Sequence, residues 1–240
     1  MEGRGHRHLA ASALAITAIV VGCSVGGASP AATSSVSGGA GGVRYVALGD
    51  SYTIGTSVDA PERWPNQLVD RLRAGGTALD LVDNLGVNGF TSRNVIDVEL
   101  PPLGQLSPGF VTLLIGVNDV VQGVPAETYR ANAGAILDAV LALVPATRVV
   151  AVSTPDYTVT PQGASFGDPV QQSAGIRANN AILKELADAR GIAFVDIYDL
   201  SLRAATDRSL VARDGLHPSG AQYALWVDRI APVVQELLKR

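Results

Sequence analysis

Short apolar segments alternate with amphipathic ones along most of this chain, beginning at Val43. Runs of β-branched and other apolar residues predict buried strands at residues 43–48, 79–85, 110–115, 148–152 and 192–197. Apolar residues at helical spacing predict helices at residues 64–74, 91–99, 125–143 and 176–190, and a last helix from Pro218. This alternation is typical of a parallel sheet that is covered by helices on both faces.

The expected fold class is therefore α/β, a three-layer α/β/α arrangement around a flavodoxin-like, doubly wound parallel sheet of five strands in the order 2-1-3-4-5. That order places strand 43–48 between strands 79–85 and 110–115. The loops that follow these three strands then meet at one crevice, and open α/β sheets bind their ligands at such a crevice.

Glycines and prolines predict where the helices end. Pro101-Pro102 is expected to break the helix at 91–99, and Gly191 is expected to cap the helix at 176–190. Pro232 is expected to kink or end the first half of the last helix. Residues 153–175 are rich in Pro, Gly, Ser and Thr, which predicts a long loop of the kind that forms a lid or a substrate rim.

The first 22 residues have the features of an export signal. Arg4 and Arg7 precede an uncharged apolar run over residues 9–21, which is too short for an ordinary transmembrane helix. The run ends in VVGC, which resembles the bacterial lipobox and implies that Cys23 becomes the lipid-modified first residue. The alternative is an ordinary signal peptide that is cut slightly further on. Both alternatives predict an exported protein, either secreted or lipid-anchored on the extracellular face of the bacterial cell membrane.

Three parts of the chain are expected: a lipoprotein signal peptide at 1–22, a flexible Gly/Ser/Ala tether at 23–42 and a folded domain at 43–240. Because Cys23 is the only cysteine, the domain has no intrachain disulfide and depends on burial of its core. The net charge of −4, without a run of Lys and Arg, argues against a nucleic-acid partner. A monomer is expected, in contact with a membrane only through its lipid anchor.

Four short motifs carry the candidate chemistry, and the first three follow the first, second and third predicted strands. They are Gly49-Asp50-Ser51, Asn84-Leu85-Gly86-Val87-Asn88-Gly89, Gly116-Val117-Asn118-Asp119 and Asp214-Gly215-Leu216-His217. Ser51 is a candidate nucleophile, which needs a base to take its proton. His217 is the only histidine of residues 43–240, because His6 and His8 lie in the leader.

Asp214 lies three residues before His217 and can fold its carboxylate back onto the imidazole, which would fix the tautomer. A helix-capping turn before Pro218 explains the same spacing equally well. An anion on an attacked carbonyl oxygen also needs hydrogen-bond donors, which Gly89, Asn118 and the Ser51 amide can supply. Taken singly, Gly89 and Asn118 are explained as ordinary turn residues.

Together and in this order, the four motifs resemble the SGNH (GDSL) hydrolase family over residues 43–240. The resemblance implies a serine esterase or acylhydrolase that forms an acyl-enzyme. In it Ser51 is the nucleophile, His217 the base, Asp214 the residue that orients it, and Gly89 and Asn118 the oxyanion donors. Members of the family cleave esters of small molecules, lipids and carbohydrates without a metal or cofactor. Asp50 and Asp119 also match family positions and are expected to brace loops.

Two other functions remain open. One is a non-catalytic lipoprotein that binds glycan or lipid on the same fold, although the presence of all four motifs argues against a pure binder. The other is a flavodoxin-like nucleotide binder, which the Asp50 carboxylate disfavours because it would repel phosphate from the first loop. The ordinary α/β-hydrolase elbow Gly-x-Ser-x-Gly is absent, since Thr53 stands where the second Gly belongs.

Several further residues receive weaker predictions. Asp156 and Tyr157 either line the substrate rim or form an ordinary Pro-Asp turn. Trp64 and Trp226 are expected in the core. Asp196 and Asp199 have no histidine near them in the sequence, so no metal site is expected there.

Overall fold

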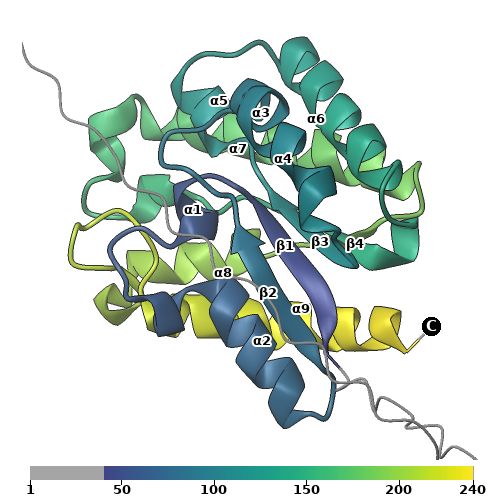
Figure 1. Ribbon diagram of the computed structural model, residues 1–240. Helices are drawn as coiled ribbons and strands as arrows, with labels where there is room; N and C mark the ends of the chain where they lie inside the picture. The colour runs from purple at the N-terminus through teal and green to yellow at the C-terminus, as the bar shows by residue number, and fades with distance from the viewer. Residues whose placement is uncertain (1–40, 240) are drawn as a thin grey trace, which may run out of the picture. The chain divides into compact units, whose positions relative to one another are not determined.

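The computed structural model describes residues 41–239, and in that range the chain forms one parallel sheet of five strands (Figure 1). The strand order is β2-β1-β3-β4-β5, as predicted. The strands are β1 (Val43–Gly49), β2 (Leu79–Asn84), β3 (Phe110–Leu114), β4 (Val149–Val152) and β5 (Ala193–Val195). The predicted signal peptide, Cys23 and almost all of the predicted tether lie outside the described residues.

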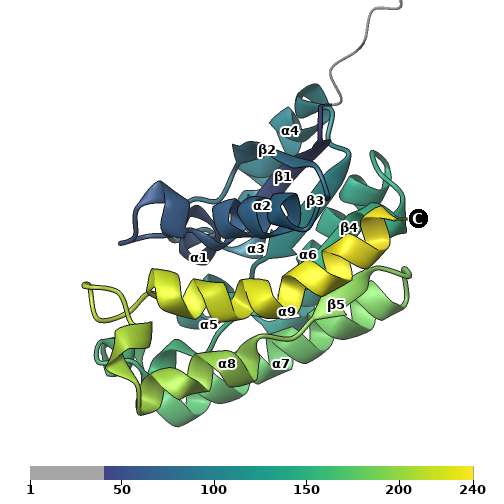
Figure 2. The same cartoon turned by 90° about the horizontal axis from the view of Figure 1, so that it is seen from below.

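Helices cover both faces of the sheet, with α2 and α9 on one face and α6 and α7 on the other (Figure 1). Helices α2 and α9 lie side by side (Figure 2). The helices are α1 (Ser51–Ile54), α2 (Trp64–Ala74), α3 (Ser92–Asn94), α4 (Leu100–Leu103), α5 (Val117–Val121), α6 (Ala126–Leu141), α7 (Pro169–Asp188), α8 (Tyr198–Leu202) and α9 (Gly220–Leu238). Within residues 41–239, none of them is both long and apolar enough to cross a bilayer.

Two apolar clusters, one on each face of the sheet, form the core. The cluster under α2 and α9 contains Trp64 and Trp226, both fully buried as predicted. The cluster under α6 and α7 contains Tyr129 and Leu183. Strands β1 and β3 contribute side chains to both clusters, which explains why their sequences are apolar at nearly every position.

The prediction that Pro101-Pro102 breaks a helix is wrong. The chain remains helical across Pro101-Pro102, because a π-helical segment at Val95–Glu99 leads into α4 and both prolines lie in the first turn of α4. Proline is tolerated there, since N–H groups in a first turn have no acceptor within their own helix. Of the two outcomes predicted for Pro232, a kink or an end of the helix, the end is excluded, because α9 continues to Leu238.

Helix α7 begins at Pro169, earlier than the predicted start at residue 176. The Asp168 side chain caps it by accepting a hydrogen bond from the backbone N–H of Gln171 at 2.9 Å. The predicted loop at 153–175 is therefore shorter, and two single turns of 3-10 helix, Tyr157–Val159 and Gly163–Phe166, order part of it.

Candidate active site

Ser51 lies at a tight turn between β1 and α1. Gly49 adopts φ +151°, and a Cβ at this position would lie 2.2 Å from the Leu114 carbonyl oxygen, so only glycine fits. The Asp50 side chain then caps α1 by accepting from the N–H of Tyr52 at 2.9 Å. These two constraints make Ser51 the first residue of the helix, at the carboxyl end of the central strands.

The His217 imidazole bridges Ser51 and Asp214. Its Nε2 lies 2.9 Å from the Oγ of Ser51, and its Nδ1 lies 2.6 Å from Oδ2 of Asp214. The other carboxylate oxygen of Asp214 accepts from the backbone N–H groups of Leu216 and His217, which folds the turn back as the spacing predicts. Side chains 166 positions apart in the chain thus form one hydrogen-bonded series.

Asp214 occupies an environment that favours its charged form. Burial would raise the pKa of this carboxyl, but hydrogen bonds from Ser57, His217 and the backbone outweigh burial and lower the pKa to about 2. Asp214 is therefore negative at any pH at which the enzyme would work, and a negative group at this place stabilises an imidazolium on His217.

Ser57 is a member of this network that the sequence analysis missed. Its hydroxyl donates to Oδ2 of Asp214 at 2.7 Å, the same oxygen that His217 contacts. Ser57 has a φ of +68°, a conformation that costs free energy for any residue with a Cβ. No motif includes Ser57, and a serine in a loop gives no signal of a partner 157 residues away.

The two residues predicted to hold an oxyanion lie on neighbouring loops. The Nδ2 of Asn118, on α5, donates one hydrogen to the Phe90 carbonyl at 3.0 Å, which leaves its second amide hydrogen free. Gly89 has φ +80° and an exposed backbone. Within the described chain, the N–H groups of Ser51 and Gly89 have no hydrogen-bond acceptor.

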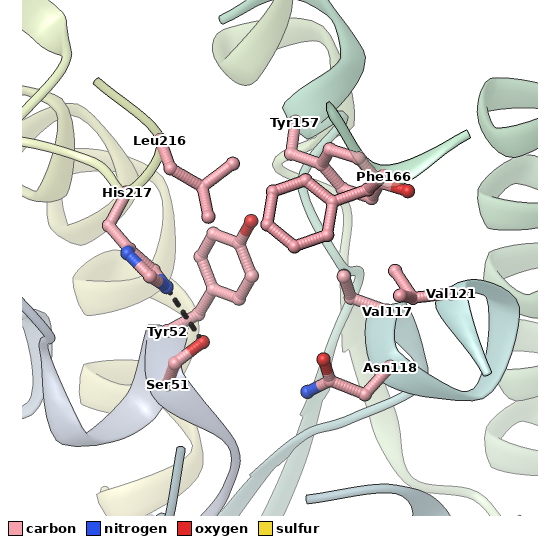
Figure 3. Close-up of a pocket in the computed structure, with 9 residues that line it drawn as sticks. All are labelled: Ser51, Tyr52, Val117, Asn118, Val121, Tyr157, Phe166, Leu216 and His217. Atoms are coloured by element: carbon pink, nitrogen blue, oxygen red, sulfur yellow. Dashed lines mark hydrogen bonds between the residues drawn. The ribbon is translucent and has the colours of Figure 1, made fainter. Parts of the chain in front are cut away.

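A cavity of about 40 Å³ lies beside the Ser51 hydroxyl. Figure 3 shows Ser51 and Asn118 on one side of it and Leu216, Tyr157 and Phe166 on the other. The residues that line it are Ser51, Tyr52, Val117, Asn118, Val121, Tyr157, Phe166, Leu216 and His217. Gly89 is not among them. The structure thus brings Ser51, His217 and Asn118 to one cavity, with Asp214 directly behind His217.

Two buried carboxyl groups lie behind the nucleophile turn. Oε2 of Glu99 accepts from the N–H of Gly49 at 2.9 Å, while its Oε1 and the Oδ2 of Asp50 are buried without a hydrogen-bond partner. Burial, reinforced by the charge of Asp50, raises the pKa of Glu99 to about 9. Burial also raises the pKa of Asp50 to about 7, despite the bond from Tyr52. The sequence analysis did not single out Glu99, because nothing in its local sequence indicates burial.

The remaining predicted residues have bracing contacts. Asp119 accepts from both the N–H and the hydroxyl of Ser92, which ties α5 to α3. The Asp156 carboxylate accepts from Ser173, Tyr198 and Thr158, whereas its neighbour Tyr157 lines the cavity.

Asp196 and Asp199 also have protein partners, the hydroxyl of Ser153 and the guanidinium of Arg229 respectively. In the part of the chain that the structure describes, no three His, Cys, Asp or Glu side chains group as ligands for a metal ion.

Comparison with known proteins shows the family to which this chain belongs. Residues 47–225 match the model of the GDSL-like Lipase/Acylhydrolase family. An arylesterase from Vibrio mimicus is 30% identical over 90 residues, which is 37% of this chain and 44% of that protein. The match thus spans less than half the length of this curated relative.

Solved structures share the fold. TesA superposes with a TM-score of 0.65 at 19% identity, covering 81% of this chain and 99% of that one. A variant of an acetyl xylan esterase from Geobacillus stearothermophilus gives 0.64 at 18% identity, covering 81% and 95%. A lipase/acylhydrolase from Enterococcus faecalis gives 0.65 at 18% identity, covering 81% and 96%. At these identities the likeness concerns the fold alone.

Proposed function

Because this chain belongs to the GDSL-like lipase/acylhydrolase family, we propose that it hydrolyses carboxylic esters with Ser51 as nucleophile, His217 as general base and Asp214 as the group that orients His217. The observation that carries this proposal is the hydrogen-bonded series from Asp214 through His217 to Ser51, with distances of 2.6 Å and 2.9 Å. The 2.9 Å distance lets Nε2 of His217 take the proton of Ser51, and the 2.6 Å distance lets Asp214 fix the orientation of the imidazole.

The reaction proceeds in two halves. Nε2 of His217 takes the proton of Ser51 as Oγ bonds to the ester carbonyl carbon, and it then gives that proton to the alcohol oxygen as the carbon–oxygen bond to the alcohol breaks. Water attacks the acyl-enzyme while His217 takes one of its protons. The proton returns to Oγ as the acid leaves, so the enzyme is regenerated.

The oxyanion is held by donors that have no other acceptor. The N–H groups of Ser51 and Gly89 and the second amide hydrogen of Asn118 fit this role. Asn118→Ala is expected to lower kcat by roughly 10²–10³-fold, because it removes one preorganised donor. Since the bond to Phe90 also disappears, the thermal unfolding of the variant is measured in parallel to separate loss of the donor from loss of the fold.

The decisive variant is Ser51→Ala, assayed on p-nitrophenyl acetate. Turnover is expected to fall by roughly 10⁴-fold or more, because the covalent path is lost. Ser107→Ala is the matched control, since Ser107 is exposed and precedes β3, at the other end of the sheet. A fluorophosphonate probe should label wild type and the control but not Ser51→Ala. If the folded wild-type protein neither hydrolyses esters nor takes the label, the proposed ester hydrolysis is refuted and a binding function is favoured.

We also propose that the enzyme is exported and held at the cell surface by a lipid on Cys23, and that its ester substrate is a small molecule or a glycan. The leader composition and the VVGC sequence support export and lipidation. Incorporation of an alkyne-tagged fatty acid in a bacterial host, lost in Cys23→Ala, is the expected result. A protein released without lipid after ordinary signal cleavage would contradict the anchor and leave export intact.

A further inference from the structure

The space next to the nucleophile is small. Its volume of about 40 Å³ is roughly a tenth of the ~300–1,000 Å³ of pockets that enclose a drug-sized ligand, so a short acyl group such as acetyl fits it better than a long chain.

The chemistry of the lining indicates which part of an ester enters this cavity. The carbonyl carbon must reach the Oγ of Ser51, and its oxygen must face Asn118, the other polar group on that side (Figure 3). The acyl chain, which stays on this carbon through both halves of the reaction, then points toward Val117, Val121 and Leu216. Since these side chains are apolar, they suit a hydrocarbon acyl chain and not a hydroxylated alcohol.

Aromatic side chains close the far end of the cavity. Tyr157 is fixed by the hydrogen bond from its hydroxyl to Oε1 of Gln172, at 2.7 Å. Phe166 packs on it edge to face, with ring centroids 5.7 Å apart. Tyr157 is buried, whereas Phe166 is 40% exposed and has this one ring contact within the described chain. An acyl chain longer than the cavity must therefore displace Phe166.

The hydroxyl of Tyr52 also disfavours a long alkyl chain. Its ring packs near His217 and Trp226, and its hydroxyl points toward the gap between Leu216 and Phe166 (Figure 3). Within residues 41–239 this hydroxyl forms no hydrogen bond with another protein group. A long alkyl chain would enclose the hydroxyl without a partner, whereas a short acyl group leaves it accessible to solvent.

We infer that the enzyme selects esters of short acyl chains, acetyl above all, and that Phe166 sets the upper limit of chain length. This inference rests on the ester hydrolysis proposed above and names the substrate class of that same site. The leaving alcohol lies outside the cavity, near Nε2 of His217, so the cavity does not limit its size.

The test is a series of p-nitrophenyl esters, acetate to octanoate, in which the leaving group stays constant. Wild type is expected to prefer acetate over octanoate by about 100-fold in kcat/KM, and Phe166→Ala to shrink this ratio by at least about tenfold through faster hydrolysis of the longer esters. Tyr52→Phe should raise the rate on hexanoate relative to acetate by a few-fold. Val170→Ala is the matched control, because Val170 is 76% exposed and does not line the cavity.

The outcomes separate the two proposals. If wild type hydrolyses octanoate as fast as acetate, or if Phe166→Ala keeps the wild-type chain-length profile, the short-acyl inference is wrong. The proposed ester hydrolysis is unaffected by either result. If no ester of any length is hydrolysed and Ser51 takes no fluorophosphonate, the proposed function itself fails, and the inference fails with it.

Discussion

Two carboxyl groups reach Ser51 from different directions and ionise in opposite ways. Asp214 acts on the side chain through His217, and its pKa is lowered to about 2. Glu99 acts on the backbone through the N–H of Gly49, and its pKa is raised to about 9. Burial favours the neutral form of both groups.

The two carboxyls differ in their hydrogen bonds and in their depth of burial. Asp214 accepts from Ser57, from the imidazole of His217 and from two backbone N–H groups, whereas Glu99 accepts from Gly49 and leaves its second oxygen buried without a partner. Deep burial with one donor keeps Glu99 neutral at neutral pH, whereas Asp214, with a side chain 28% exposed and four donors, is charged. The charged carboxyl is placed where an imidazolium forms, and the neutral one supports the turn of Ser51.

The largest difference in kcat is expected when each carboxyl is replaced by an isosteric amide. Asp214→Asn is expected to lower kcat by roughly 10⁴-fold, because the amide neither fixes the tautomer of His217 nor stabilises its charged form. Glu99→Gln should retain near-wild-type kcat at pH 7, since Glu99 is already neutral there. The measurement is steady-state hydrolysis of p-nitrophenyl acetate. A comparable loss in both variants would show that Glu99 is charged in the working enzyme.

Removal of one hydrogen-bond donor to Asp214 should weaken the effect of this carboxylate on His217 without abolishing it. Ser57→Gly is expected to lower kcat by about tenfold, in line with the loss of one hydrogen bond to a charged group. Glycine relieves the strain at φ +68° but also loses the hydrogen bond to Asp214, so the two effects oppose each other and the unfolding free energy should change by no more than about 1 kcal/mol.

Ser107→Gly is the control for this pair of effects. Ser107 also has a positive φ, +47°, but it lies outside the site. The substitution should stabilise the protein and leave kcat unchanged. Urea unfolding together with kcat distinguishes the cases, and full activity in Ser57→Gly would show that Ser57 has no role beyond the fold.

A third effect is on stability as a function of pH. The pKa of Glu99 in the folded protein lies above its unfolded value, so its contribution to stability is complete below about pH 4 and is lost as the pH rises toward 9. From about pH 5 to pH 9, wild type should lose up to about 1 kcal/mol per pH unit more than Glu99→Gln, and Asp50, whose pKa is about 7, is present in both proteins.

The contribution of Asp214 to stability changes with pH in the opposite direction. Its pKa is lowered, so its contribution is complete above about pH 4 and is lost only as the pH falls toward 2. Urea unfolding of wild type and Glu99→Gln across the range from pH 5 to 9 measures the difference. Parallel stability curves for the two proteins would contradict the raised pKa of Glu99.

Much of the fold is encoded locally. The apolar strands at Val43 and Phe110 and the helix at Trp64–Ala74 follow from periodicity and flanking glycines, and the order of the strands is the one expected of a flavodoxin-like doubly wound sheet. Helix ends at proline were harder to predict. Pro101 is expected from the sequence to break a helix, and Pro169 falls in the predicted loop at 153–175, but both lie in first turns, where proline fits.

The sequence by itself determined the candidate chemistry, because Ser51 follows the first strand and His217 is the one imidazole of the domain. Only the tertiary structure decided that Ser57 meets Asp214, that Glu99 is buried under Gly49, and that Phe166 closes a cavity of about 40 Å³. The physical reason is range: hydrophobic periodicity and capping signals extend over a few residues, whereas burial, pKa and cavity size depend on atoms from distant segments packed together.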